Sequence, residues 1–236
     1  EAFIVGFVFR NQLRKSVPNL LEGFKLFLEQ NPGSGARLLL HTHWQEGWDI
    51  PRLIQEKGLD PTQILTTYVC QNCKEYEVKS FAGETKETGE NQDCRFCGAE
   101  KSQVTTNVKV GVSEEQLNEI YNLMDAYCHP FTSGGQEIPV QEAKLTELIT
   151  LVTDYSCGEE SATYESGGLP LHWSEYREPG TQFIKASTNP SSIARQLKKV
   201  YKMKPAKRIE VGKRARKYVI DNYSTESVCE KLEDII

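Results

Sequence analysis

The residues best suited to chemistry in this chain are four cysteines in two matched pairs. Cys70-x-x-Cys73 and Cys94-x-x-Cys97 are separated by 20 residues. Each Cys-x-x-Cys turn lets two thiolates reach one tetrahedral ion, so this spacing predicts a zinc site. Four thiolates leave no open coordination position, and the ion would therefore be structural rather than catalytic. Two disulfides or free thiols are the alternatives, although paired Cys-x-x-Cys motifs favour metal binding in a reducing compartment.

A second stretch that could bind a ligand begins at a small-residue turn, Ser133-Gly134-Gly135. Glycine has no side chain, so this turn can bring backbone amides close to a ligand. Pro139 then suits the first position of a helix, because its φ fits there and its missing N–H is not needed. The unpaired N–H groups at such a helix start form an anion site. An ordinary turn before an amphipathic helix is the alternative.

Two basic residues, Arg10 and Lys15, follow the first apolar segment. Residues 3–9 are apolar and β-prone, which predicts a buried strand that ends at the basic loop 10–16. Fixed cations at this position would stabilise a departing diphosphate, which gains negative charge in the transition state. A solvated basic loop is the alternative.

The elements that must position these residues alternate between strand and helix. Buried strands are predicted at 3–9, 37–42, 64–68, 104–110, 126–129 and 149–152. Helices are predicted at 17–29, 51–57, 113–124, from Pro139, and at 190–201, 205–221 and 224–235. This order predicts an α/β fold with a Rossmann-like parallel sheet flanked by helices. After the second strand, His41, His43, Trp44 and Trp48 indicate either aromatic packing or a ligand-lining loop.

The glycine turn and the helix with Pro139, Glu142 and Ala143 resemble the donor-binding motif of retaining nucleotide-sugar glycosyltransferases with the GT-B fold. The spacing of Arg10 and Lys15 is similar to that of the arginine and lysine after the first strand of that family's C-terminal lobe. The resemblance covers about residues 3–68 and 104–235. It implies a donor-binding lobe over 1–236, with C-terminal helices over 204–236 and an inserted zinc ribbon or knuckle over 69–103.

The resemblance also implies roles for individual residues. Catalysis is assigned to Arg10, Lys15 and Glu137. Binding of a nucleotide-diphosphate sugar is assigned to Gly134, Gly135, Gln136 and Glu142. Glu142 would accept hydrogen bonds from the ribose hydroxyls, since one carboxylate can accept two. No catalytic metal is expected, because cationic side chains and the helix start take that role.

In one position the chain departs from the family. The family usually carries two glutamates eight positions apart, and the residue eight before Glu142 is Gly134. Gln136 or Glu137 is then expected to supply the missing sugar contact.

With 236 residues the chain can hold only one of the two GT-B lobes, and Glu1 in place of methionine indicates a trimmed or processed fragment. We therefore expect donor binding but poor turnover without an N-terminal acceptor lobe.

The net charge and the hydropathy of the sequence limit the classes of partner that this chain is expected to bind. The net charge of −5 gives no general reason to expect nucleic acid. Without a secretory signal or a membrane-length apolar run, a cytoplasmic protein is expected. Residues 195–217 contain eleven Lys or Arg and one Glu. This basic run could contact the missing lobe or an anionic membrane surface, whereas a solvated helix face is the simpler alternative.

Two other function classes are consistent with these features. A sugar-nucleotide epimerase shares the fold, and it would differ in epimerising rather than transferring the sugar. A non-catalytic binding module built around the zinc ribbon would keep its ligand affinity after loss of Arg10 and Glu142.

Overall fold

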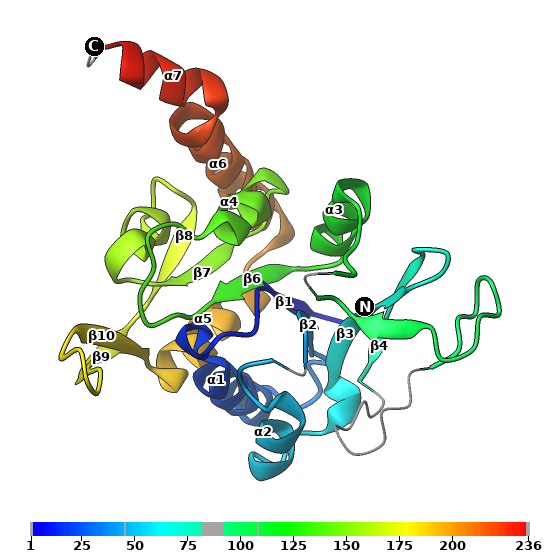
Figure 1. Cartoon of the computed structure of the whole chain (residues 1–236). Helices are drawn as coiled ribbons and strands as arrows, with labels where there is room; N and C mark the ends of the chain where they lie inside the picture. Colours follow the sequence, from blue (N-terminus) through cyan, green and yellow to red (C-terminus); the bar gives the residue numbers. More distant parts are fainter. Residues whose placement is uncertain (1, 45, 82–91, 108, 235–236) are drawn as a thin grey trace.

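The computed structural model describes residues 2–44, 46–81, 92–107 and 109–234. It is built on an eight-stranded sheet with the strand order β4-β3-β2-β1-β6-β7-β8, in which β5 also pairs with β3. Figure 1 shows α3, α4 and α6 on one side of the sheet and α1, α2 and α5 on the other. The predicted α/β fold, with a mainly parallel sheet between helices, is confirmed.

The centre of the sheet is parallel and almost wholly buried. β1 lies between β2 and β6, and β7 lies between β6 and β8, all in parallel register. Apolar strands suit this place because helices cover both faces. The strand bounds are β1 Ile4–Val8, β2 Arg37–His41, β3 Ile64–Cys70, β6 Ala126–His129, β7 Thr150–Thr153 and β8 Gly168–Leu171.

The helices begin at recognisable start signals. Proline occupies the first or second position of α1, α2, α4, α5 and α6, where its missing N–H costs nothing. α3 begins at a capping box in which the side chains of Ser113 and Gln116 each accept a hydrogen bond from the other's backbone N–H. The helix bounds are α1 Val17–Gln30, α2 Ile50–Glu56, α3 Glu114–Asn122, α4 Ile138–Leu145, α5 Pro190–Tyr201, α6 Pro205–Tyr223 and α7 Thr225–Glu233.

The cysteine-containing segment departs from the parallel pattern. β4 (Tyr76–Ser80) and β5 (Gln103–Thr105) both pair antiparallel with β3, so the described part of the predicted ribbon extends the main sheet. Residues 82–91 of that ribbon lie outside the described residues. The strand predicted over 104–110 is wrong in length, because it ends at Thr105. Asn107 Oδ1 accepts hydrogen bonds from two following backbone N–H groups and turns the chain there.

An antiparallel hairpin of β9 (Trp173–Arg177) and β10 (Ile184–Thr188) forms a separate small sheet, which the sequence did not predict. The C-terminal helices α6 and α7 extend to the upper left of Figure 1, where the chain ends. α6 packs on α4, whereas no residue of α7 is buried. From the basic run 195–217, Arg208, Arg214 and Arg216 donate hydrogen bonds to backbone carbonyls outside α6, so part of the run holds α6 in place.

Within the described chain, no helix has the length and apolar character needed to cross a bilayer.

Candidate functional site

The carboxyl ends of β1 and β2 open onto a hollow at the edge of the sheet, where α/β folds commonly bind ligands. This edge cavity has a volume of about 360 Å³ and mainly apolar walls. The chain after β5 forms one side, and the start of α4 forms another. Its lining residues are Val8, Phe9, Arg10, His41, Thr42, His43, Glu46, Thr106, Asn107, Gly111, Val112, Leu117 and Pro139.

Arg10 lies at this cavity because it follows β1 directly. Its side chain is 61% exposed, and its Nε lies 3.5 Å from Glu46 Oε2. An exposed pair of this kind contributes little free energy, so an incoming anion can replace Glu46. Deeper in the cavity, the Thr42 hydroxyl is buried and has no hydrogen-bond partner within the described part of the chain. The cavity therefore offers an accessible cation, whereas the Thr42 hydroxyl is shielded from it.

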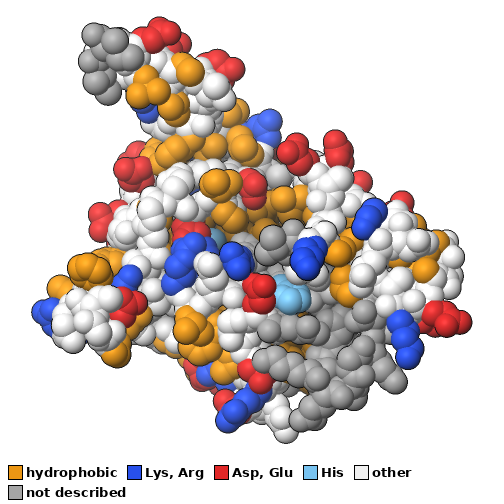
Figure 2. Space-filling view, in the orientation of Figure 1, with side chains coloured by type: hydrophobic (Ala, Val, Ile, Leu, Met, Phe, Trp, Pro, Cys, Tyr) orange, Lys and Arg blue, Asp and Glu red, His pale blue; other side chains and the backbone are white. Residues whose placement is uncertain are grey.

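Lys15 is placed differently from Arg10. It ends the short 3-10 turn Leu13–Lys15, and its ammonium forms a buried ion pair with the Glu137 carboxylate. Arg14 Nη1 donates to the other carboxylate oxygen at 2.5 Å, and His129 Nε2 lies 3.0 Å from Glu137 Oε2. We call these four residues the Glu137 cluster; Arg14 is its exposed member. Figure 2 shows charged side chains and a histidine on the surface near the centre of the face viewed in Figure 1, whereas Lys15, His129 and Glu137 are buried.

Burial and charge set the protonation of this cluster. Burial lowers the pKa of Lys15, an effect that Glu137 opposes. Burial also lowers the pKa of His129 to about 4, so at neutral pH the ring is uncharged; its Nε2 contacts Glu137 and its Nδ1 lies 3.0 Å from the Tyr127 hydroxyl. Burial alone would raise the pKa of Glu137, but the hydrogen bond with His129 and the charge of Lys15 hold it far below its ordinary value. Glu137 is therefore ionised and fully engaged.

The glycine turn leaves room for this carboxylate. A Cβ at position 134 would lie 2.7 Å from Glu137 Oε1, so any larger residue would displace the Glu137 side chain. The Ser156 hydroxyl donates to the Gly134 carbonyl at 2.8 Å and fixes the turn. Gly135 and Gln136 are exposed and remain outside the cluster.

Glu142 lies one turn into α4 and faces α3. Its Oε2 accepts a hydrogen bond from the Tyr121 hydroxyl at 2.8 Å. Both residues line a second hollow of about 260 Å³ between the two helices. Leu117 lines this hollow and the edge cavity alike, so the two adjoin.

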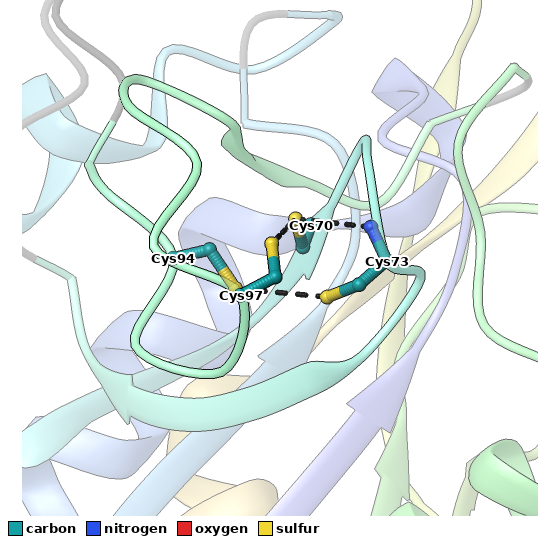
Figure 3. Close-up of side chains that lie close together, drawn as sticks. All are labelled: Cys70, Cys73, Cys94 and Cys97. Carbon is teal, nitrogen blue, oxygen red and sulfur yellow. Dashed lines mark hydrogen bonds between the residues drawn. The ribbon is translucent and has the colours of Figure 1, made fainter.

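The four cysteines come together as the sequence predicts (Figure 3), and their Sγ atoms all lie within 4.8 Å of one another. The Sγ–Sγ distances are 3.8 Å for Cys70–Cys97 and 3.7 Å for Cys73–Cys94. Sulfurs bound tetrahedrally to zinc at about 2.3 Å lie about 3.8 Å apart, by the geometry of the tetrahedron. A disulfide has an S–S distance of about 2.05 Å. The geometry fits a metal ion, and the cysteines are not joined by disulfides.

The two cysteine turns are built alike. The backbone N–H of Asn72 donates to Cys70 Sγ at 3.3 Å, and that of Phe96 donates to Cys94 Sγ at 3.4 Å. Such bonds favour the thiolate forms that a metal requires. Gly98 follows the second pair with φ +71°, a conformation that glycine adopts without strain.

The structure thus unites the cysteines and joins Lys15 to Glu137, whereas Arg10 pairs with Glu46 and Glu142 with Tyr121. Sequence reasoning missed two members of the cluster, Arg14 and His129. A signal for His129 existed: it ends the strand beside β1, and adjacent parallel strands deliver their following loops to one edge.

No protein-family model matches the chain, and no curated protein matches it. Several solved structures match its fold. A mutant of S. aureus TarM in complex with Fondaparinux, alpha-GlcNAc-glycerol and UDP is 14% identical with a TM-score of 0.63, over 98% of this chain and 34% of that one. Sucrose-phosphate synthase from Thermosynechococcus elongatus is 15% identical with a TM-score of 0.62, over 99% and 44% of the two chains.

A third match is the C-terminal domain of LpcC, a glycosyl transferase group 1 family protein from Francisella tularensis. It is 13% identical with a TM-score of 0.58, over 94% of this chain and 87% of the domain. Our chain therefore spans less than half of the first two structures but most of this isolated domain. At such identities the similarity shows a shared fold, that of one lobe of a GT-B glycosyltransferase.

Proposed function

We propose that this chain, which has the fold of one GT-B lobe, binds the donor of a glycosyltransferase that moves a sugar from a nucleotide diphosphate to an acceptor with retention. The observation that carries the proposal is the edge cavity, which lies at the carboxyl ends of β1 and β2 between Arg10 and the start of α4. The presence of UDP in the TarM complex, which has a similar fold, supports a nucleotide as ligand.

The cavity's chemistry suits the parts of a nucleotide diphosphate. Its apolar walls would cover a base. The exposed Arg10 guanidinium would bind the diphosphate in place of Glu46. The N–H groups at the start of α4, beside Pro139, would add to this anion site.

Glu142 would bind the ribose. Its hollow adjoins the edge cavity at Leu117, and one of its oxygens is already held by Tyr121, which fixes the carboxylate's direction. The second oxygen can accept from a ribose hydroxyl.

Lys15 and Glu137 would act together during transfer. The departing diphosphate gains negative charge, and Lys15 is the buried cation nearest in sequence to Arg10. Because Glu137 already neutralises Lys15, the diphosphate must compete with Glu137 for it. We propose that Arg10 and Lys15 stabilise the leaving group and that Glu137 holds Lys15 in position. The turn Gly134, Gly135 and Gln136 would line the sugar.

A second lobe would supply the acceptor site and complete the cleft. The proposal is supported by length, since the chain covers 34% of TarM but 87% of an isolated C-terminal domain. Alone, the chain would bind donor and turn over slowly. For the four-cysteine centre we propose zinc, because four thiolates are one of its common structural ligand sets.

The experiment that tests this function compares Glu142→Gln with the parent by isothermal titration. The substitution keeps the shape but removes the charge, so affinity for UDP or another accepted nucleoside diphosphate should fall by about tenfold. A 2′,3′-dideoxy nucleotide should bind both proteins equally, because the contact is already missing. Equal losses for both ligands would mean a damaged fold, and the ribose role would have to be withdrawn.

A further inference from the structure

We infer that the four-cysteine centre holds one wall of the edge cavity in place, so that metal binding and nucleotide binding are coupled. The inference rests on the proposed function, since it takes a nucleoside diphosphate as the ligand of the cavity. It assigns the insertion a positioning role in donor binding.

The first link runs through β5. β4 pairs with residues 65–69 of β3 along one edge, so β5 must lie along the other, where the pairing of β2 with β3 ends at Thr66. β5 therefore continues the sheet at the carboxyl end of β2, next to the edge cavity. The Trp44 backbone N–H donates to Thr105 Oγ1 at 3.4 Å and joins the two segments.

The cysteines tie β5 to β3. Cys70 pairs with Gln103 at the end of the β3–β5 ladder, and the Gln71 N–H donates to the Ser102 carbonyl at 2.8 Å. Cys97 lies close to Cys70 and only a few residues before β5. A metal held by all four cysteines would therefore fasten the segment that leads into β5.

The residues that come directly after β5 in the sequence form one wall of the edge cavity. Thr106, Asn107, Gly111 and Val112 come directly after β5 and line the cavity, opposite His41 and Thr42. A shift of β5 would move this wall, because Thr106 and Asn107 directly follow the last residue of β5.

The second link runs through α3. Gln116 Nε2 donates to the Lys74 carbonyl at 3.3 Å, and the Tyr76 hydroxyl donates to Glu119 at 2.7 Å. The same helix carries Leu117, which lines both hollows, and Tyr121, which holds Glu142. The cysteine turn at 70–74 is thus connected to the proposed ribose site by one helix.

Backbone pairing with β3 holds β4 in place, and Tyr76 and Val78 are partly buried against the main core. Among the described residues between 71 and 102, no aliphatic or aromatic side chain is fully buried. The cysteine turns at 70–74 and 94–98 have no buried aliphatic or aromatic side chain, so metal–thiolate bonds would supply their order. Loss of the metal would therefore loosen both links.

The test measures UDP, ADP and GDP affinity by isothermal titration in the metal-loaded parent, in chelator-treated parent and in Cys97→Ser. Zinc content and far-UV circular dichroism are followed in parallel. Metal loss should weaken binding about five- to a hundredfold while the helices persist. By reciprocity, the nucleotide should raise metal affinity by the same factor. Cys229→Ser, at an exposed cysteine in α7, is the matched control and should match the parent.

A second variant leaves the cysteines untouched. Tyr76→Phe removes only the hydroxyl that bonds to Glu119, so it should keep the metal and bind the nucleotide about two- to tenfold more weakly. Tyr223→Phe, at the end of α6 and away from the cavity, loses a similar hydrogen bond to Glu160 and should leave metal content and nucleotide affinity unchanged.

Two outcomes distinguish a failure of the proposed coupling from a failure of the proposed nucleotide-binding function. If the metal-loaded parent binds none of the three diphosphates, the proposed function falls and the inference falls with it. If the parent binds one but metal loss and Tyr76→Phe leave its affinity unchanged, the inference alone is overturned.

Discussion

The Glu137 carboxylate forms a buried ion pair with the Lys15 ammonium, across 122 residues of sequence. Arg14 and His129 are its other partners. The lysine that the resemblance assigns to the donor diphosphate therefore already has an internal anion. Any phosphate that uses Lys15 must compete with Glu137, and this competition sets the first prediction.

Glu137→Gln should increase affinity for a nucleoside diphosphate about tenfold, because a charged competitor for Lys15 is removed. The variant should also be less stable, since Lys15 is left buried without its counter-charge. Isothermal titration measures the first effect and urea unfolding the second. A nucleoside without phosphates should bind both proteins alike. Glu159→Gln, at an exposed position, is the control. Unchanged or weaker diphosphate binding in Glu137→Gln would show that Lys15 does not meet the phosphates.

Arg10→Ala should weaken nucleoside diphosphate binding by about 1–3 kcal/mol, the range for hydrogen bonds to charged groups. Its guanidinium is exposed at the edge cavity, so the loss should come without a change in stability. Arg52→Ala removes an equally exposed arginine on α2 and should have no effect. The same Kd for Arg10→Ala and the parent would remove Arg10 from the phosphate site.

Lys144 supplies a pH-dependent prediction. It is wholly buried in α4 and donates to the carbonyls of Ser161 and Ser166 at 2.9 and 2.6 Å. Burial lowers its pKa from 10.5 to about 7. Between these values the unfolded chain holds a proton that the native chain lacks. The free energy of unfolding should therefore rise with pH above 7, by at most about 1.4 kcal/mol per pH unit from this residue, and gain nothing from it below pH 7.

Urea unfolding at pH 7, 8 and 9 measures this slope. Lys144→Met should flatten it relative to the parent, whereas Lys213→Met, at an exposed position on α6, should leave it unchanged. Equal slopes in all three proteins would mean that Lys144 keeps an ordinary pKa in the native chain.

The local signals in the sequence predicted the fold well. Pro139 starts α4 near its predicted position, and the Ser113–Gln116 capping box forms with both its hydrogen bonds. The cysteine spacing predicted the cluster because two short turns contain all its geometry. These features depend on residues a few positions apart, and such patterns are visible in a single sequence.

Contacts between distant segments were harder to predict. The residues next to Lys15 in the sequence give no sign that it is buried, because its partner Glu137 lies in a loop 122 residues further along the chain. The direction of β4 and β5 was also hidden, since short polar strands at a sheet edge lack the apolar runs of the centre. The β9–β10 hairpin was missed for the same reason: its outer strand is mostly exposed.

The central claim is that the edge cavity binds a nucleoside diphosphate, and the melting temperature of the parent chain tests it most directly. A ligand that binds only the native state stabilises it by about 2.7 kcal/mol at a hundred times its Kd. If the edge cavity binds a nucleoside diphosphate, UDP, ADP or GDP at millimolar concentration should raise the melting temperature of the parent chain by several degrees. The matching nucleoside should raise it less, and Arg10→Ala should reduce the shift. No shift with any diphosphate, in protein with its metal content verified, would contradict the account.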